Sequence, residues 1–232
     1  MDELKCLAAD LQPDVICISE TWTHADHTKA FLTIDNYGPP VGRRDRADTG
    51  AGRGGGVLIW VRCDISAPES ERPEFRQFKQ CCCVKLPIRN GQELELVLVY
   101  RPHRLYGDDE VNANNALLGS LFQSVQKPAV FLGDFNCSDI DWETATSGSV
   151  GSFLLHAASE NFYTQHVDFA TLPDAQTMPD LVFSSDQNLI LDVLKLSPLG
   201  KSDHVMMLVT GPLGAPLRAS RFPTGRRLIW KG

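Results

Sequence analysis

The sequence has no apolar run close to the roughly 20 residues that a membrane-spanning helix requires. It also lacks a basic N-terminal segment followed by an apolar stretch, so it shows no secretory signal. Positive charge is not in excess either: the formal net charge is −7, which argues against a general nucleic-acid coat protein. An enzyme that holds one phosphate through a cation and a few local arginines is still compatible with that value, because net charge averages over the whole surface.

Cysteine pairs of the C-x-x-C type are absent as well. The seven cysteines are an odd number, and three of them are consecutive, at Cys81, Cys82 and Cys83. Neighbouring residues of a strand point to opposite faces, so this trio cannot enclose one metal ion. We interpret the cysteines as reduced, structural residues of an intracellular protein, nuclear or cytoplasmic, rather than as a disulfide framework.

The chain has 232 residues, 43% of them hydrophobic, which is enough for one substantial globular domain. Apolar spacing predicts helices over 1–11, 108–126 and about 149–161. Asn90-Gly91 predicts a hairpin turn between two of the strands. Mixed strands and helices indicate a layered α/β or α+β domain. The predicted strands are DVICISE, GGVLIWV (55–61), CVKLPI (83–88), LELVLVY (94–100), AVFLGD (129–134), LVFS (181–184), ILDVLKL (190–196) and HVMMLVT (204–210).

Composition also divides the chain. Residues 1–211 carry the apolar periodicity of a single domain, without an internal repeat. The Gly- and Arg-rich segment 45–56 resembles a mobile loop. Residues 212–232 hold several arginines and little apolar periodicity, so we expect a flexible tail or linker there.

Polar residues of catalytic type follow several of the predicted strands. Glu20, Tyr100 and Asp134 each stand at a strand's end, and Asp203-His204 precedes another strand. Ligands of layered α/β sheets collect outside the carboxyl ends of strands, so these residues are expected to share one edge. Each has a plainer explanation: Glu20 could open a loop, Asp134 with Asn136 could form an Asx-turn, and Asp203-His204 could be a surface turn.

Taken together, these groups favour phosphate chemistry. Mg²⁺ prefers oxygen ligands and uses one or two carboxylates, and a water nucleophile needs an orienting carboxylate with donors for the phosphate oxygens. Period-two alternation places Asp134 and Asn136 on one face, with Phe135 turned into the core. Two other motifs are set aside: His24, Asp26 and His27 lie in a polar loop, and GRGGG (52–56) lacks the continuation of a P-loop.

Six motifs occur together in a recognisable order: DVICISETW, GGVLIWV, LVLVYRP, VFLGDFN, PDLVF and KSDH. In order and spacing they resemble the endonuclease/exonuclease/phosphatase superfamily, and ETW, YRP and GDFN together look most like the endonuclease domain of non-LTR (LINE-type) retrotransposons. The similarity covers residues 1 to about 210. The resemblance implies a DNase I-like four-layered α/β sandwich, with two packed mixed sheets flanked by helices.

The resemblance also implies catalytic roles, position by position. Glu20 matches the main metal-binding glutamate, with Asp203 as the neighbouring acid at the metal. Asp134 matches the aspartate that orients or deprotonates the attacking water. His204 matches the catalytic histidine, and Asp180 matches the acid paired with it. The implied cofactor is Mg²⁺, with Mn²⁺ as a substitute.

Substrate contacts are implied in the same way. Tyr100 matches a tyrosine near the scissile phosphate, and Asn136 matches the amide that holds the phosphate and helps to orient the aspartate. Arg101 and Ser202, next to these motifs, are expected to contact substrate too. The implied partner is duplex DNA, with no membrane and no obligatory protein partner, and the implied product is a nick that primes reverse transcription.

The chain departs from the pattern of this family at three places. Such domains normally begin with a further strand that carries an asparagine or aspartate of the metal site, so we expect the sheet to lack its first strand and to expose a pairing edge. Thr171-Leu172 stands where relatives often have Thr-Arg, and the acidic balance weakens attraction to a duplex. A basic patch of Arg43, Arg44, Arg46 and Arg53 could compensate, or these arginines could form a solvated loop.

These departures leave alternatives open. The first reading is a Mg²⁺-dependent DNA endonuclease. The second is a catalytically impaired or domesticated fragment of the same fold that acts as a binding module. The third keeps the chemistry but takes another substrate, as in the phosphatase and phosphodiesterase branches. Metal-dependent plasmid nicking separates the first reading from the other two.

Overall fold

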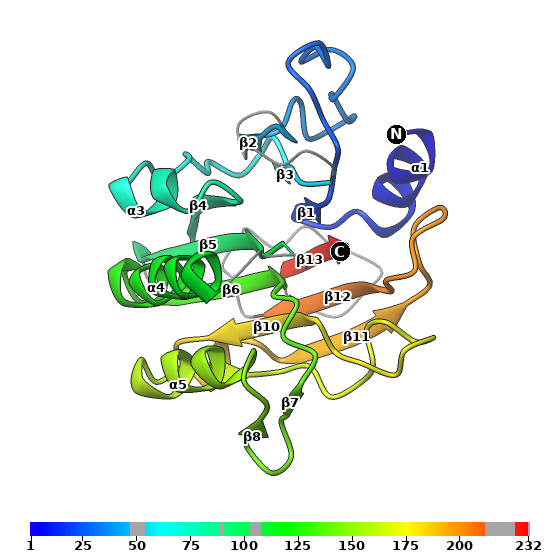
Figure 1. Cartoon of the computed structure of the whole chain (residues 1–232). Helices are drawn as coiled ribbons and strands as arrows, with labels where there is room; N and C mark the ends of the chain where they lie inside the picture. The colour runs from blue at the N-terminus through cyan, green and yellow to red at the C-terminus, as the bar shows by residue number, and fades with distance from the viewer. Residues whose placement is uncertain (47–53, 89–90, 103–107, 212–225, 232) are drawn as a thin grey trace.

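The computed structural model describes residues 1–46, 54–88, 91–102, 108–211 and 226–231. Two β-sheets pack face to face, and helices lie on their outer faces (Figure 1). Each sheet mixes parallel and antiparallel pairs. The predicted four-layered sandwich of two mixed sheets is therefore confirmed.

The first sheet has six strands in the order β11-β12-β13-β1-β3-β2. Its central strand β1 is an unbroken apolar run that is buried on both faces, as expected for the interior of a layered fold. β1 pairs antiparallel with β3 and parallel with β13. The bounds are β1 Val15–Ser19, β2 Gly42–Arg44, β3 Val57–Val61, β11 Asp192–Leu196, β12 Met206–Gly211 and β13 Arg226–Lys231.

The second sheet has five strands in the order β4-β5-β6-β10-β9. Its only parallel pair among the described strands is β5 with β6, and α4 makes the crossover between them. A separate two-stranded ribbon, β7 with β8, follows β6. The bounds are β4 Cys81–Pro87, β5 Glu93–Tyr100, β6 Ala129–Asp134, β7 Ile140–Asp141, β8 Thr146–Ser147, β9 Thr164–Gln165 and β10 Asp180–Ser184.

The helices cover opposite faces of the sandwich. α1 packs Leu4 and Ala8 on the outer face of the first sheet, where they meet Ile16 and Trp60. α3, α4 and α5 cover the outer face of the second sheet (Figure 1). Among the described residues, no helix is both long and apolar enough to cross a lipid bilayer. The bounds are α1 Asp2–Leu11, α3 Pro73–Gln77, α4 Asp108–Ser124, α5 Ser152–Glu160 and the short 3-10 helix η2 Gln187–Leu189.

The consecutive cysteines show how the layers are filled. Cys82 points between the two sheets, whereas Cys81 and Cys83 point toward α3 and α4. This is the alternation expected of a strand, and it places the three thiols in two different cores. Burial raises the pKa of the Cys82 thiol, so it acts as a small apolar side chain.

The expected tail is wrong for its last part. Residues 226–231 form β13, which lies between β12 and β1 in the middle of the first sheet. Leu228, Ile229 and Trp230 are buried there, so a short apolar run that shows no periodicity of its own gains its place by pairing. The pairing edge of β1 that we expected to be exposed is therefore covered by β13.

Several smaller expectations have mixed outcomes. The helix and strand segments predicted over the domain all appear within a few residues of their expected bounds. β2 and α3 were not predicted, since each is short and neither has a clear apolar period. Asn90 of the predicted hairpin turn and residues 47–53 of the predicted mobile loop lie outside the described residues.

Candidate active site

Three of the predicted site residues stand side by side at one edge of the second sheet. Tyr100 ends β5, Asp134 ends β6 and Asp180 begins β10. Asp134 pairs with Tyr100 on one side and with Asp180 on the other. Directly opposed side chains of paired strands lie on the same face, about 5 Å apart. The strand register alone therefore brings a phenol and two carboxyl groups together.

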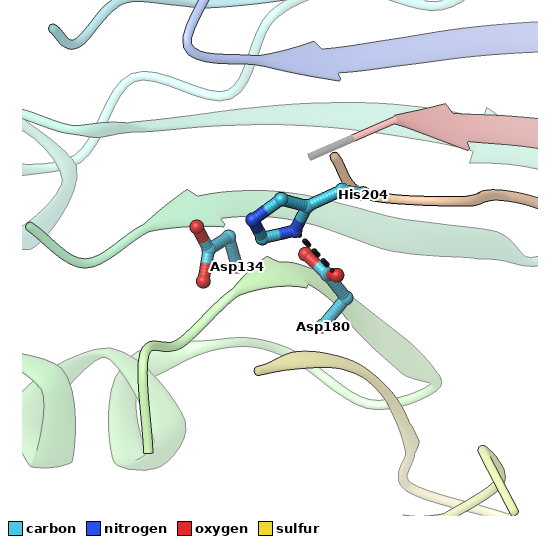
Figure 2. Close-up of side chains that lie close together, drawn as sticks. All are labelled: Asp134, Asp180 and His204. Carbon is cyan, nitrogen blue, oxygen red and sulfur yellow. Dashed lines mark hydrogen bonds and ion pairs between the residues drawn. The ribbon is translucent and has the colours of Figure 1, made fainter. Parts of the chain in front are cut away.

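The first sheet supplies two more groups at the same edge. Glu20 follows β1, and its Oε1 accepts a hydrogen bond from the Tyr100 hydroxyl. His204 lies just before β12, and its Nδ1 is 2.7 Å from Asp180 Oδ2. The site thus joins the edges of both sheets. The ligating atoms of Asp134, Asp180 and His204 lie within 4.8 Å of one another, and the imidazole points toward both carboxylates (Figure 2).

The electrostatics of the cluster favour a charged imidazole. Burial by itself would lower the pKa of His204, but the hydrogen bond and charge of Asp180 outweigh it. With further help from the charges of Asp134 and Asp203, the pKa of His204 rises to about 9. At neutral pH the ring is therefore an imidazolium, with its Nδ1–H donated to a carboxylate that is fully buried.

Asp134 experiences the opposite pressure. Burial and the charge of Asp180 raise its pKa well above the ordinary value, and Glu20 adds to the rise. The charge of His204 and the Asn136 backbone N–H oppose it. Three carboxyl groups thus meet around one imidazolium, an excess of negative charge that a bound divalent cation would relieve. The donor set, rich in carboxylate oxygen, suits a hard cation such as Mg²⁺.

The turn after β6 shapes the site around Asp134. At Gly133 a Cβ would lie 1.8 Å from the carbonyl oxygen of Val99 in β5, so only glycine allows the two strands to approach there. After Asp134 the chain leaves the strand, and Asn136 adopts a left-handed φ of 49°. The Asn136 N–H donates to Asp134 Oδ1 at 3.0 Å. The Asx-turn and the site, which we had set as alternatives, therefore coexist.

Asn136 is also tied to the neighbouring strand end. Its Nδ2 donates to the Arg101 carbonyl oxygen at 2.7 Å, which leaves the second N–H of the amide for a substrate oxygen. Our period-two argument for Asn136 was wrong, because β6 already ends at Asp134 and the turn, not the strand, orients the amide. Phe135 is buried, as expected.

Arg101 does not fit the role of a substrate contact. Its side chain is buried, and the guanidinium donates to Asn114 and Asn115 of α4 and lies against Cys137. Arg101 therefore anchors α4 beside the site and contributes to it through its backbone carbonyl. The expectation of a phosphate contact assumed an exposed side chain, which the packing of α4 rules out for this conformation.

Two residues of the KSDH motif shape the approach to His204. Ser202 Oγ accepts from the His204 N–H at 3.2 Å, so this hydroxyl supports the turn before β12. Asp203 is exposed, and its charge helps to raise the pKa of His204. Within the described residues, neither Asp203 nor Glu20 belongs to a group of three potential metal ligands, so their metal role stays a prediction.

Glu20 sits against a glycine segment that sequence reasoning treated as part of a loop. A Cβ on Gly54 would lie 3.1 Å from Glu20 Oε1 and 3.8 Å from the Tyr100 hydroxyl, and the φ of Gly54 is +79°. The φ of Glu20 itself is 50°, a left-handed conformation that a non-glycine residue adopts at a cost. Burial, followed by the hydrogen bond and charge of Glu20, raises the pKa of Tyr100, which keeps its hydroxyl a donor.

Thr171 is a positioning residue whose role sequence reasoning missed. It is fully buried, and its Oγ1 accepts from the Asp180 N–H at 3.2 Å. Its carbonyl oxygen accepts from the Val205 N–H at 2.9 Å. Thr171 therefore ties Asp180 to the segment that carries His204. Its position in the motif of relatives with Thr-Arg was the only signal.

Residues set aside earlier have structural roles. His24 and His27 stack, and the His24 N–H donates to His27 Nδ1, so this pair builds a turn. Arg43 pairs with Asp45, and Arg44 pairs with Glu69. Arg53 lies outside the described residues. The proposed basic patch is thus partly neutralised by acids.

Comparisons with known proteins decide the family. The model of the endonuclease/exonuclease/phosphatase family matches residues 4–204. The chain belongs to this family. No curated protein sequence matches this family member significantly.

Solved structures of the same fold include both nucleases and phosphatases. The endonuclease domain of TRAS1, a telomere-specific non-LTR retrotransposon, has a TM-score of 0.59 at 17% identity, with 88% of each chain covered. The Xenopus laevis APE2 catalytic domain has a TM-score of 0.59 at 14% identity, over 99% of this chain and 88% of that one. The Bacteroides thetaiotaomicron mannosyl-6-phosphatase has a TM-score of 0.52 at 16% identity, over 87% and 86%. At such identities the similarity shows the fold and leaves the substrate open.

Proposed function

We propose that the chain is a Mg²⁺-dependent phosphodiesterase that nicks duplex DNA, as an endonuclease of the non-LTR retrotransposon type. The observation that carries the proposal is the cluster of Asp134, Asp180 and His204 beside the hydrogen-bonded pair of Glu20 and Tyr100. A carboxylate with a raised pKa lies next to an imidazolium, which is a base and an acid within one site. The likeness to the TRAS1 endonuclease domain supports the choice of DNA.

In this proposal Asp134 receives the proton of the attacking water. Its raised pKa brings its basicity closer to working pH, which makes proton transfer more favourable than for an ordinary aspartate. His204 donates to the phosphate oxygens on which negative charge grows, and Asp180 keeps the ring charged and oriented. The P–O bond to the 3′ oxygen breaks, and the proton that this oxygen needs comes from the acidic groups of the site.

Asn136 and Tyr100 position the substrate. The second amide N–H of Asn136 is available to a non-bridging oxygen of the phosphate, while the first is held by Arg101. Tyr100 keeps Glu20 in place through its hydroxyl. Glu20, with Asp134 or Asp203 nearby, would hold the Mg²⁺ or Mn²⁺ ion. The ion supplies Lewis-acid stabilisation of the phosphate charge when it is bound.

A plasmid-nicking assay tests the proposal. Purified protein is incubated with supercoiled plasmid and Mg²⁺, and open-circle product is measured with and without EDTA. We expect Asp134→Ala and His204→Ala each to lower the nicking rate about 10²- to 10⁴-fold, the contribution typical of general acid–base groups. The matched control is His156→Ala, because the His156 side chain on α5 is 70% exposed and pairs only with Glu160 at the surface.

The result also separates the alternatives. Unchanged nicking in both Asp134→Ala and His204→Ala would refute the assigned chemistry. Absence of nicking by the unchanged chain, combined with hydrolysis of a soluble phosphate ester, would favour the phosphatase branch. Thermal unfolding of each variant confirms that the fold is intact before its rate is compared.

A further inference from the structure

An exposed tryptophan lies next to the catalytic edge. Trp22 is 41% exposed, although Trp60 and Trp230 are almost completely buried in the same fold. It stands two residues after Glu20, whose carboxylate meets the Tyr100 hydroxyl. Large aromatic side chains bury much apolar area when they can, so an aromatic ring left at the rim of a site is available to a ligand.

The backbone around Trp22 is held rigidly. The Trp22 N–H donates to the Gly55 carbonyl at 3.0 Å, and the Thr21 N–H donates to the Gly56 carbonyl at 3.2 Å. Trp22 itself has a left-handed φ of 55°, a cost that the surrounding contacts must offset. Thr23 is buried, and its carbonyl accepts from the Arg46 N–H at 2.9 Å. The exposed ring is therefore fixed in place relative to Glu20.

A cation accompanies the ring. The guanidinium carbon of Arg46 lies 5.6 Å from the centroid of the Trp22 ring. An aromatic face for a base and a guanidinium for a phosphate are the two elements with which proteins bind single-stranded nucleic acid. No requirement of the fold core explains a Trp–Arg pair at this exposed position.

We propose that Trp22, with Arg46, is a stacking platform for an unpaired nucleobase next to the scissile phosphate. The proposal rests on the function proposed above and narrows its substrate class. A base inside a duplex has both faces covered by its neighbours, so only an extruded, mismatched or single-stranded base can stack on the ring. The chain should therefore favour DNA that is unpaired beside the cleavage site over a fully paired duplex.

Binding of short oligomers tests this directly. The probes are a twelve-residue oligothymidylate and an abasic sugar-phosphate oligomer of the same length, which carries the same charge without bases. We expect Trp22→Ala to weaken oligothymidylate binding about 5- to 150-fold, the effect of losing one stacked base, and to leave binding of the abasic oligomer unchanged. Trp22→Phe should retain most of the affinity. Bound oligothymidylate should also quench the tryptophan fluorescence of the unchanged protein, and less so that of Trp22→Phe.

The chain offers a matched control. Phe162 is 81% exposed, and Lys127 Nζ lies 5.8 Å from its ring centroid, so it forms a similar cation–aromatic pair. Lys127 precedes β6, whereas Asp134 ends it, which places the control pair at the opposite end of that strand. Phe162→Ala should leave the binding of both oligomers unchanged.

The outcomes separate this proposal from the proposed function. Equal weakening of both oligomers by Trp22→Ala, or no effect on either, would overturn the stacking role even if plasmid nicking is normal. An effect restricted to oligothymidylate in a chain that does not nick plasmid would support the stacking role and overturn the endonuclease. Failure of the unchanged chain to bind either oligomer would also overturn the stacking role. Thermal unfolding of Trp22→Ala shows whether the fold persists.

Discussion

The ion pair of His204 with Asp180 makes stability and activity depend on pH in a defined direction. The pKa of His204 rises from 6.5 to about 9 in the folded chain. Because the folded pKa is the higher one, the pair stabilises the fold fully below pH 6.5, and its contribution is lost as pH rises through about 9. Each pKa unit corresponds to about 1.4 kcal/mol, which gives at most about 3 kcal/mol, and screening by solvent at the partly exposed ring reduces this to about 2 kcal/mol.

Asp180→Asn removes the charge and keeps the shape of the partner. Without the carboxylate, burial is left as the main influence on the ring, and the pKa of His204 should fall below 9 toward or below 6.5. At pH 6 the variant should unfold about 2 kcal/mol more easily than the unchanged chain. Above pH 9 this difference should shrink, because the imidazole of the unchanged chain is then neutral as well.

Two measurements check this prediction. NMR titration of the His204 ring gives its pKa in both proteins, and urea unfolding at pH 6 and pH 10 gives the difference in free energy of unfolding. The nicking rate of the unchanged chain should decline as pH rises through about 9. A His204 that titrates near 6.5 in the unchanged chain, or an identical pKa in Asp180→Asn, would refute the reasoning. His204→Gln, which cannot be charged, should abolish the pH dependence of the difference.

Two further predictions concern the fold around the site. Gly133→Ala should destabilise the chain by more than about 3 kcal/mol or prevent folding, because the new Cβ meets the Val99 carbonyl at 1.8 Å; near-normal urea unfolding would contradict the close approach. Trp230→Ala should cost about 3–5 kcal/mol, since the ring is fully buried in β13 between the two sheets. Trp230→Phe should cost much less, because it also removes an indole N–H that has no hydrogen-bond partner; equal losses for the two variants, by guanidinium unfolding, would show that β13 packs otherwise.

Local patterns explain most of what could be predicted. β1, β5 and β6 are runs of β-branched and leucine residues, and such runs are recognisable because both faces are buried. Strand ends then located Tyr100 and Asp134, since the parallel pair β5–β6 brings both carboxyl ends to the same edge. The catalytic residues with the strongest family signal were thus the ones that regular structure positions.

The parts that could not be predicted depend on contacts between distant segments. β13 has no period of its own, and its burial comes from pairing with β1 and β12. Arg101 was expected to be exposed, but α4 supplies partners for its guanidinium. Asn136 is oriented by a left-handed turn, to which strand alternation does not apply. The contact of Gly54 with Glu20 joins two loops, and no spacing rule links them.

The position of β13 has a consequence for how the chain is made. β1 pairs with a strand from the other end of the sequence, so its parallel partner is synthesised only after more than 200 further residues. At typical synthesis rates of about 5–20 residues per second, this delay is about 10–40 seconds. During this time β1 and β12 each present an unpaired edge, the kind of surface that recruits wrong strands. The nascent chain therefore depends on protection by chaperones until its last strand emerges from the ribosome.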